Sequence, residues 1–394
     1  MSGKYKGKCI NFELWYTDED EQDLNRIYHT LERLIKQDID TAITEGCNAV
    51  IGLLLYEGFL YKDHKEYYDL LKRVHDYGTQ KGIKKFILVC GIVWDYQNKL
   101  IENGLDYTII PFDYSANAMW VSYQYKQLPN WNSNSNKFLF LGGVANRPNR
   151  IKLTAKFYDA GLLDNKSAIW SFFPPYTSED KIGCRQLLPH YNDIQYKDFI
   201  QYASRAVDSK YETAQTYSRA SGKEWKEKKY LETDFFKDPN FIDQQIYIKS
   251  SISVISEGHV YPPAYDYRFL TEKTWRAVIN KHPFILADCT QRKEFAKQQG
   301  LDLFEDIFID KYSDVNLEGV VSNVKHFLKV KDNNKELIQE KVNNNYRAFL
   351  NVIKGNEQKL KYLQQLFSLT EIEINAWFRQ KSFDHLFRIP EFIE

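Results

Sequence analysis

Short apolar runs alternate with amphipathic stretches along the first third of the chain. Residues 9–16 predict a first strand, and residues 47–56 form a nearly continuous apolar run, which is typical of a strand covered on both faces of a parallel sheet. Residues 19–45 between them predict a long amphipathic helix, whose apolar face is formed by Leu24, Ile27, Leu31, Leu34 and Ile35. The next predicted elements are a helix at 62–81, a strand at 85–92, a short helix near 97–103 and a strand at 107–112. This alternation predicts a doubly wound α/β domain.

A second α/β unit is expected after the polar stretch at residues 127–137, which is rich in Asn and Ser and lacks periodicity. The elements predicted for it are a strand at 138–141, a glycine-containing loop at 142–149, a helix at 150–160, strands at 168–173 and 251–256, a helix starting after Thr271, a strand at 283–288, a helix at 291–299 and a strand at 306–309. From residue 333 to about residue 387 the pattern is helical, with breaks expected at Gly355 and near Ser368.

These patterns predict two similar Rossmann-like α/β domains facing a cleft, with a helical C-terminal tail. The expected divisions are an N-terminal domain at 1–127, a linker at 128–136, a C-terminal domain at 137–332 and a tail at 333–394 that packs back on the body.

Composition narrows the class of protein. Lys and Arg together number 53, as do Asp and Glu, so no global field attracts nucleic acid, although residues 219–230 are locally basic with interleaved aromatic residues. The five cysteines lack metal-ligand spacing and are expected to be reduced. They are Cys9, Cys47, Cys90, Cys184 and Cys289. Without an apolar signal core or a membrane-spanning run, the expected location is the cytoplasm.

The stretch at residues 251–288 carries the clearest candidate chemistry. In a βαβ unit, the loop and the following helix N-terminus lie at the carboxyl ends of parallel strands, where open α/β sheets bind ligands. Thr271 is expected to cap the helix, with Glu272 and Lys273 in its first turn. Backbone N–H groups and a lysine suit a phosphate, while a glutamate can accept hydrogen bonds from ribose or sugar hydroxyls. The combination therefore predicts a nucleotide sugar as ligand.

The sequence from Phe269 to residue 275, FLTEKTW, resembles the YVTEKLW signature of the α-1,3-fucosyltransferase family. It is also similar to an FxTEKT segment, followed by HPF, in phage and viral glycosyltransferase-like proteins. The resemblance implies that Glu272 and Lys273 bind the nucleotide sugar, the lysine through its diphosphate. It further implies that Glu257 matches a glutamate at the end of the preceding strand, and that Phe269 matches the aromatic residue before the TEK triplet.

A second segment, KFLFLGGVANRPNRI at residues 137–151, also fits this family. There, the first strand of the donor domain leads through a loop to an arginine that neutralises the diphosphate. Arg150 is the best match, and Arg147 is the nearby alternative. The residues alone point the same way, because a guanidinium at a helix N-terminus after the Gly142–Gly143 turn suits bidentate phosphate binding.

An inverting sugar transfer also needs a base to take the proton of the acceptor hydroxyl. Glu57, Asp95 and Asp113 follow predicted strands of the N-terminal domain. We prefer Glu57, which precedes Gly58 in an expected exposed turn. The competing interpretation is that such residues cap the next helix or turn.

Together, these features predict a metal-independent, inverting glycosyltransferase of the GT-B fold, a hexosyl- or pentosyltransferase. The N-terminal domain would lie on the acceptor side, and the C-terminal domain would bind a nucleotide-diphosphate sugar as donor substrate, with no further cofactor. The acceptor would be a glycan or a hydroxymethylated base in phage DNA, which would place the protein in the host cytoplasm. The alternative is a non-catalytic nucleotide-sugar or carbohydrate-binding module that keeps the fold. The sequence leaves the oligomeric state undefined.

Overall fold

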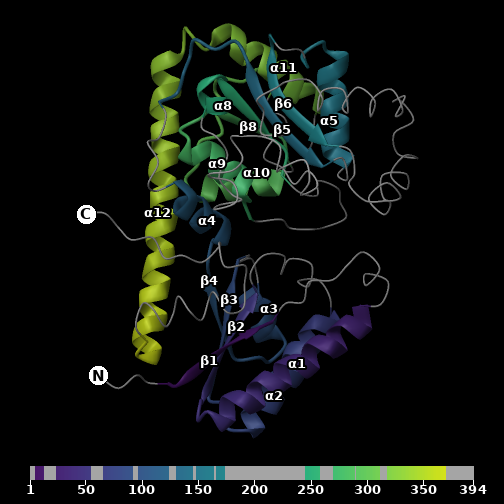
Figure 1. Cartoon of the computed structure of the whole chain (residues 1–394), viewed down its shortest axis with the longest axis vertical. Helices are drawn as coiled ribbons and strands as arrows, with labels where there is room; N and C mark the ends of the chain where they lie inside the picture. The colour runs from purple at the N-terminus through teal and green to yellow at the C-terminus, as the bar shows by residue number, and fades with distance from the viewer. Residues whose placement is uncertain are drawn as a thin grey trace, which may run out of the picture. The chain divides into compact units, whose positions relative to one another are not determined.

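The structure is a computed structural model that divides into two compact units, each an α/β body with a four-stranded parallel sheet (Figure 1). The first unit comprises residues 1–121, 266–269 and 351–394, and the second comprises residues 122–265 and 270–350. The residues that the structure describes are 5–12, 24–54, 65–91, 96–123, 130–144, 148–163, 166–173, 245–257, 269–288, 290–310 and 317–369.

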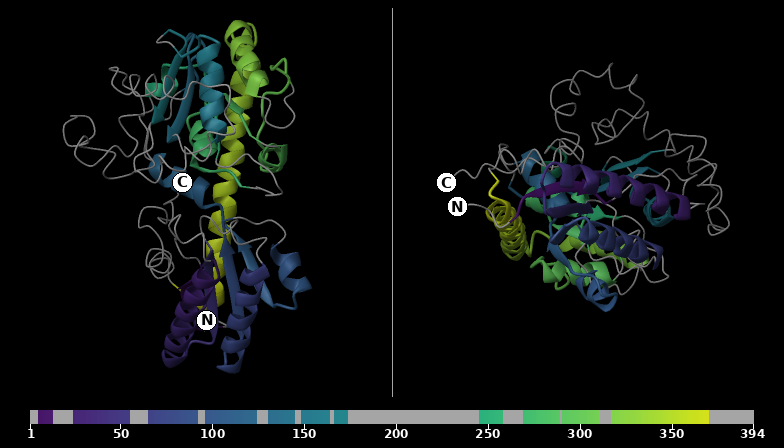
Figure 2. Two further views of the ribbon diagram at one scale, coloured as in Figure 1. Left: turned by 90° about the vertical axis from the view of Figure 1, so that its right-hand side faces the viewer. Right: turned by 90° about the horizontal axis from the view of Figure 1, so that it is seen from below.

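The sheet of the first unit has the simple strand order β1-β2-β3-β4. Its strands are β1 (Gly7–Asn11), β2 (Ala49–Leu54), β3 (Lys85–Cys90) and β4 (Tyr107–Pro111). Its helices are α1 (Leu24–Thr44), α2 (Lys65–Gln80), α3 (Tyr96–Glu102) and α4 (Tyr114–Tyr123), which ends just past the boundary of the unit. Because right-handed crossovers that always advance in one direction place their helices on one side, α1, α2 and α3 share one face of this sheet. Figure 2 shows α1 and α2 side by side on it.

The opposite face of this sheet is covered by the last part of the chain. Helix α12 (Lys335–Phe367) packs Leu360, Leu363 and Phe367 against the alternate strand residues that point away from α1 and α2. At Gly7 the contact is so close that an added Cβ would lie 2.5 Å from the Phe367 ring. The prediction of a doubly wound N-terminal domain is therefore wrong for the described strands, because their consecutive order leaves one face for a helix distant in sequence.

The sheet of the second unit has the order β6-β5-β7-β8. Its strands are β5 (Phe138–Val144), β6 (Ala168–Phe173), β7 (Ile252–Ile255) and β8 (Phe284–Leu286). Its helices are α5 (Pro148–Asp159), α8 (Gln245–Ile248), α9 (Glu272–Ile279), α10 (Thr290–Gln298), α11 (Leu317–Val330) and the first half of α12. The chain moves from β5 to β6 on one side and later adds β7 and β8 on the other. Helices cover both faces as a result: α5 packs Phe157 on Phe138 and Phe140, whereas α8 packs Tyr247 on the face of Leu139.

The predicted elements match most of the observed ones, with shifted ends. Residues 142–144 continue β5 past an irregularity in register instead of forming a loop. Residues 301–310 contain no strand, since Phe304 has a φ of 59° and the chain turns there. Helix α12 runs unbroken through Gly355, because buried residues on both sides outweigh the roughly 1 kcal/mol that an internal glycine costs. The break near Ser368 is confirmed.

Some packing details also differ from the sequence prediction. Leu34 is 38% exposed, and Tyr28 takes its place in the core of the first unit. Helices α4 and α11 were not predicted. Cys9, Cys47 and Cys90 are free and buried, as predicted, and burial raises the pKa of the Cys47 thiol. Among the described residues, no helix is long and apolar enough to cross a membrane.

The polar stretch predicted as a linker packs closely in the second unit where the structure describes it. Trp131 is buried, and its indole N–H donates to the Ser251 carbonyl at 2.8 Å. The buried Lys331 ammonium donates to the Ser133 carbonyl at 2.5 Å. These bonds tie residues 130–137 to the start of β7 and to the end of α11.

His282 precedes β8 and forms buried polar contacts with Ser250, which precedes β7, and with Ser253 in β7. Its Nε2 lies 3.0 Å from the Ser250 carbonyl, and its Nδ1 lies 2.8 Å from the Ser253 hydroxyl. Because a carbonyl can only accept, Nε2 carries the proton and Nδ1 accepts from Ser253. Burial lowers the pKa of His282 to about 4, although hydrogen bonding to backbone groups acts in the opposite direction.

We predict that Leu363→Ala destabilises the first unit by about 2–5 kcal/mol, the usual cost of truncating a buried leucine. Leu363 is 1% exposed, whereas its neighbour Tyr362 is 47% exposed, so Tyr362→Ala is the matched control. Chemical denaturation of the full chain measures both. Equal stability of the two variants would contradict the packing of α12 on the first sheet.

We predict that His282 makes the second unit sensitive to acid. Its pKa is about 4 in the folded protein, against an ordinary value of 6.5, so the unfolded chain binds the proton more readily. The contribution to stability is complete above pH 6.5 and is lost as the pH falls toward 4, by about 2 kcal/mol between pH 7 and pH 5. Denaturation at both pH values should show a smaller difference for His282→Gln than for the wild type. His29→Gln, at an exposed position on α1, should keep the wild-type difference.

Candidate functional site

The second sheet has a topological switch point between β5 and β7, because the chain leaves β5 in one direction and β7 in the other. Open α/β sheets bind ligands outside the carboxyl ends of strands at such a point. Two predicted site residues lie there: Arg150 in the first turn of α5, which follows β5, and Glu257 two residues after β7. The fold therefore brings together two segments that the sequence analysis selected separately.

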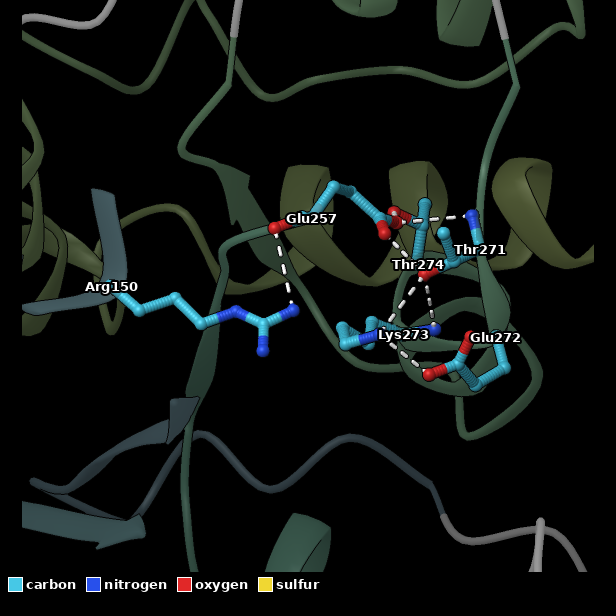
Figure 3. A network of polar contacts seen from close by, with 6 residues as sticks. All are labelled: Arg150, Glu257, Thr271, Glu272, Lys273 and Thr274. Atoms are coloured by element: carbon cyan, nitrogen blue, oxygen red, sulfur yellow. Dashed lines mark hydrogen bonds and ion pairs between the residues drawn. The ribbon is translucent and has the colours of Figure 1, made fainter. Parts of the chain in front are cut away.

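Glu257 is fully buried, and its carboxylate joins the end of β7 to the start of α9. One oxygen accepts the Thr271 backbone N–H at 3.2 Å and the Thr274 hydroxyl at 2.5 Å. The other oxygen accepts the Thr271 hydroxyl (Figure 3). An ionised carboxylate only accepts hydrogen bonds, so three donors compensate for its removal from water. Glu257 has no exposed surface in this arrangement. The predicted contact of its carboxylate with donor hydroxyls stays a prediction.

The side chain of Arg150 contacts the backbone of Glu257. Its side chain is nearly buried, and Nη2 donates to the Glu257 carbonyl at 3.5 Å. In Figure 3 the guanidinium points toward Glu257, on whose far side the start of α9 lies. Glu257 thus binds α5 through its main chain and α9 through its side chain.

The first turn of α9 is held from two directions. The Thr271 hydroxyl oxygen accepts the Lys273 N–H at 3.3 Å, so Thr271 caps the helix as predicted. One turn further on, Trp275 is fully buried, with its ring centroid 5.6 Å from that of Phe349 on α12. The cap and the buried ring together fix the direction of the first turn.

The side chains of Glu272 and Lys273 form an ion pair at this turn. Lys273 Nζ lies 2.6 Å from Glu272 Oε1, and the side chains of Lys273 and Glu272 are 26% and 20% exposed, respectively. Burial acts to raise the pKa of Glu272, but the charges of Lys273 and Arg276 and the hydrogen bond from Lys273 outweigh it, and the pKa falls to about 2. The carboxylate is therefore ionised at neutral pH.

A cavity of about 30 Å³ lies beside this turn, on the face of the sheet covered by α8 and α9. Its polar wall includes Lys273 and Arg276, which are separated by one helical turn, and its floor includes Leu139 and Leu141 of β5. This volume is sufficient for a water molecule. The two cations therefore border a small space next to the switch point.

The remaining predicted site residues are distributed as follows. Gly142 and Gly143 lie in β5, and Phe269 is partly buried two residues before the N-cap. Asp113 caps α4, since its Oδ1 accepts the Ala116 N–H at 2.7 Å. The predicted residues outside the described part of the chain are Glu57, Asp95 and Arg147.

Asp113 is further held by Asn356 of α12, whose amide bonds both its N–H and its carbonyl at 3.2 and 2.8 Å. This geometry supports the capping interpretation of Asp113, and its role as a base stays a prediction.

Thr274 and Arg276 belong to the site but were not among the residues predicted from the sequence. Thr274 could have been found from its spacing, because a hydroxyl three residues after the cap faces the same side of the helix start. Arg276 carries the same kind of signal, lying four residues after Glu272. No group of three or more His, Cys, Asp or Glu residues within the described ranges could hold a metal ion.

The fold defines an α/β protein in which Arg150, Lys273 and Arg276, here called the cationic site, lie near the switch point of a parallel sheet. A scan against protein-family models found no match, and searches of curated proteins and of solved structures also found none.

We predict that Glu257→Gln destabilises the second unit by about 1–3 kcal/mol, because the amide presents a donor where the carboxylate accepts three hydrogen bonds. Chemical denaturation measures the change. Glu318→Gln, at an exposed ion pair with Lys156, is the matched control and should have little effect. If both variants unfold like the wild type, Glu257 does not hold α9 in place.

Proposed function

We propose that this protein is a glycosyltransferase that moves a hexosyl or pentosyl group from a nucleotide-diphosphate sugar to an acceptor hydroxyl. The observation that carries the proposal is the convergence of Arg150 and the Lys273 turn on Glu257 at the switch point. A diphosphate carries charge on several oxygens, and a guanidinium and an ammonium from two different elements suit it. The match to the TEK motif of fucosyltransferases, on Glu272 and Lys273, supports the same class.

In the proposed reaction, the bond between the anomeric carbon and the diphosphate oxygen breaks, and a bond from that carbon to the acceptor oxygen forms. Arg150 and Lys273 stabilise the negative charge that collects on the departing diphosphate, which is the largest effect expected of a site of this kind. These two cations provide the neutralisation that a divalent ion provides in metal-dependent transferases, so we propose a metal-independent reaction.

The acceptor loses its proton as it attacks, and a carboxylate from the first unit is the proposed base. Glu57, Asp95 and Asp113 are the candidates, with Glu57 preferred because Asp113 already caps α4. Attack from the side opposite the leaving diphosphate inverts the anomeric configuration. The two units would form a GT-B arrangement, with the donor on the second unit and the acceptor on the first.

Two acceptor classes fit the proposal, a glycan and a hydroxymethylated base in DNA. The balanced net charge favours the glycan, because binding to duplex DNA depends strongly on contacts between cations and phosphates. Transfer assays with either acceptor separate them, and DNA modification should fall steeply with added salt.

We predict that Lys273→Ala and Arg150→Ala each weaken binding of the preferred nucleoside diphosphate about 10- to 100-fold, the effect of losing one charged hydrogen bond to a phosphate. Isothermal titration with a panel of nucleoside diphosphates measures this. Lys249→Ala, at an exposed lysine of the same unit, is the control and should bind like the wild type.

Donor hydrolysis or transfer by Glu57→Gln should be lost while binding is kept. Full activity in all of these variants would refute the site, and binding without turnover by the wild type would indicate a non-catalytic binding module.

A further inference from the structure

Helix α9 carries its own anion next to the proposed diphosphate site. Lys273 Nζ lies 2.6 Å from Glu272 Oε1 and 3.5 Å from the Thr271 hydroxyl, so the ammonium folds back onto the helix start. In this position the Glu272 carboxylate is paired with Lys273, whose ammonium a bound diphosphate would need. Binding of a diphosphate therefore requires Lys273 to leave Glu272, and the carboxylate must then be stabilised in another way.

Arg276 is the residue placed to do this. It lies four residues after Glu272, so both side chains are on the same side of α9. It is 8% exposed, and it lines the same cavity as Lys273. Its charge, together with that of Lys273, stabilises the ionised form of Glu272. A second cation is therefore already close to the carboxylate.

We propose that Arg276 is a positioning residue of the donor site, which holds the Glu272 carboxylate when Lys273 turns to the diphosphate. The inference rests on the proposed function, since it concerns how the same site receives its ligand. Without Arg276, the release of Lys273 would leave a partly buried carboxylate unpaired beside an incoming anion. Both the loss of pairing and the repulsion oppose binding.

The competing explanation is that Arg276 contacts the diphosphate directly. The two explanations differ in what happens when Glu272 is neutral. If Arg276 acts through Glu272, its removal is harmful only while the carboxylate is present. If Arg276 contacts the ligand, its removal is equally harmful with glutamate or glutamine at position 272.

The test is a double-mutant cycle on binding of inorganic pyrophosphate, which has no ribose or sugar for Glu272 to contact. We expect Arg276→Gln to weaken binding about tenfold and Arg276→Lys to restore it to within about threefold of the wild type. Glu272→Gln should bind more tightly than the wild type, because the competitor for Lys273 is gone. Adding Arg276→Gln to Glu272→Gln should then change the affinity less than about twofold.

Arg347→Gln, at an exposed arginine of α12 in the same unit, is the matched control and should bind like the wild type. Thermal unfolding of each variant identifies any that fail to fold, and Arg276→Lys keeps the test decisive if Arg276→Gln is one of them: binding about tenfold weaker with lysine would overturn the proposal.

An equal loss in both backgrounds would show direct contact and would also overturn it, as would normal binding by Arg276→Gln. The proposed function fails in a different way, when the wild type binds neither pyrophosphate nor any nucleoside diphosphate.

Discussion

In the second unit, the placement of helix α9 beside strand β7 depends on one buried carboxylate. Glu257 follows the end of β7, and its side chain is fully buried. Burying a carboxylate is strongly unfavourable unless its oxygens accept hydrogen bonds. Thr271 and Thr274 supply those donors from the start of α9, so the position of the helix follows from the requirement of the strand-end residue. Since the same residue's carbonyl accepts from Arg150, the lysine turn and the arginine are placed by a single group. The geometry of the cationic site is thus a consequence of satisfying Glu257.

The two units show how strand order determines what a parallel sheet can do. Both are built from the same alternation of strand and helix, and both are buried on two faces. In the first unit the order is consecutive, so the described connections leave one face open, and α12 closes it with Leu360, Leu363 and Phe367. In the second unit the order reverses beside β5, which covers both faces locally and creates a switch point. Of the strands that the structure describes, only those of the second sheet provide such a place for a ligand.

Much of this could be predicted from the sequence, because it is local. The apolar runs located the strands to within a few residues, and the Thr271 cap follows from a hydroxyl placed before a charged first turn. The strand order, the covering of the first sheet by α12 and the burial of Glu257 depend on pairings between distant segments, for which one sequence carries no signal. The strand predicted at 306–309 is absent for a related reason, because its apolar residues follow a turn that is fixed by a distant residue. The side-chain amide of Asn345 accepts the Asp302 N–H and donates to the Asp302 carbonyl.

The proposed diphosphate site must also be stable before its ligand binds. Cations gathered at one strand edge repel one another, and the Glu272 carboxylate beside Lys273 and Arg276 reduces this repulsion. The Glu257 carboxylate is buried and accepts hydrogen bonds from Thr271 and Thr274, whereas Glu272 is partly exposed and paired with a lysine that is itself partly exposed. In the proposed function, Lys273 exchanges Glu272 for a ligand while Arg276 stabilises the carboxylate, whereas breaking the buried Glu257 hydrogen bonds would be costly. The division of roles between the two glutamates therefore follows from their burial: Glu257 fixes the start of α9, and Glu272 neutralises Lys273, which in the proposed function exchanges the carboxylate for a ligand.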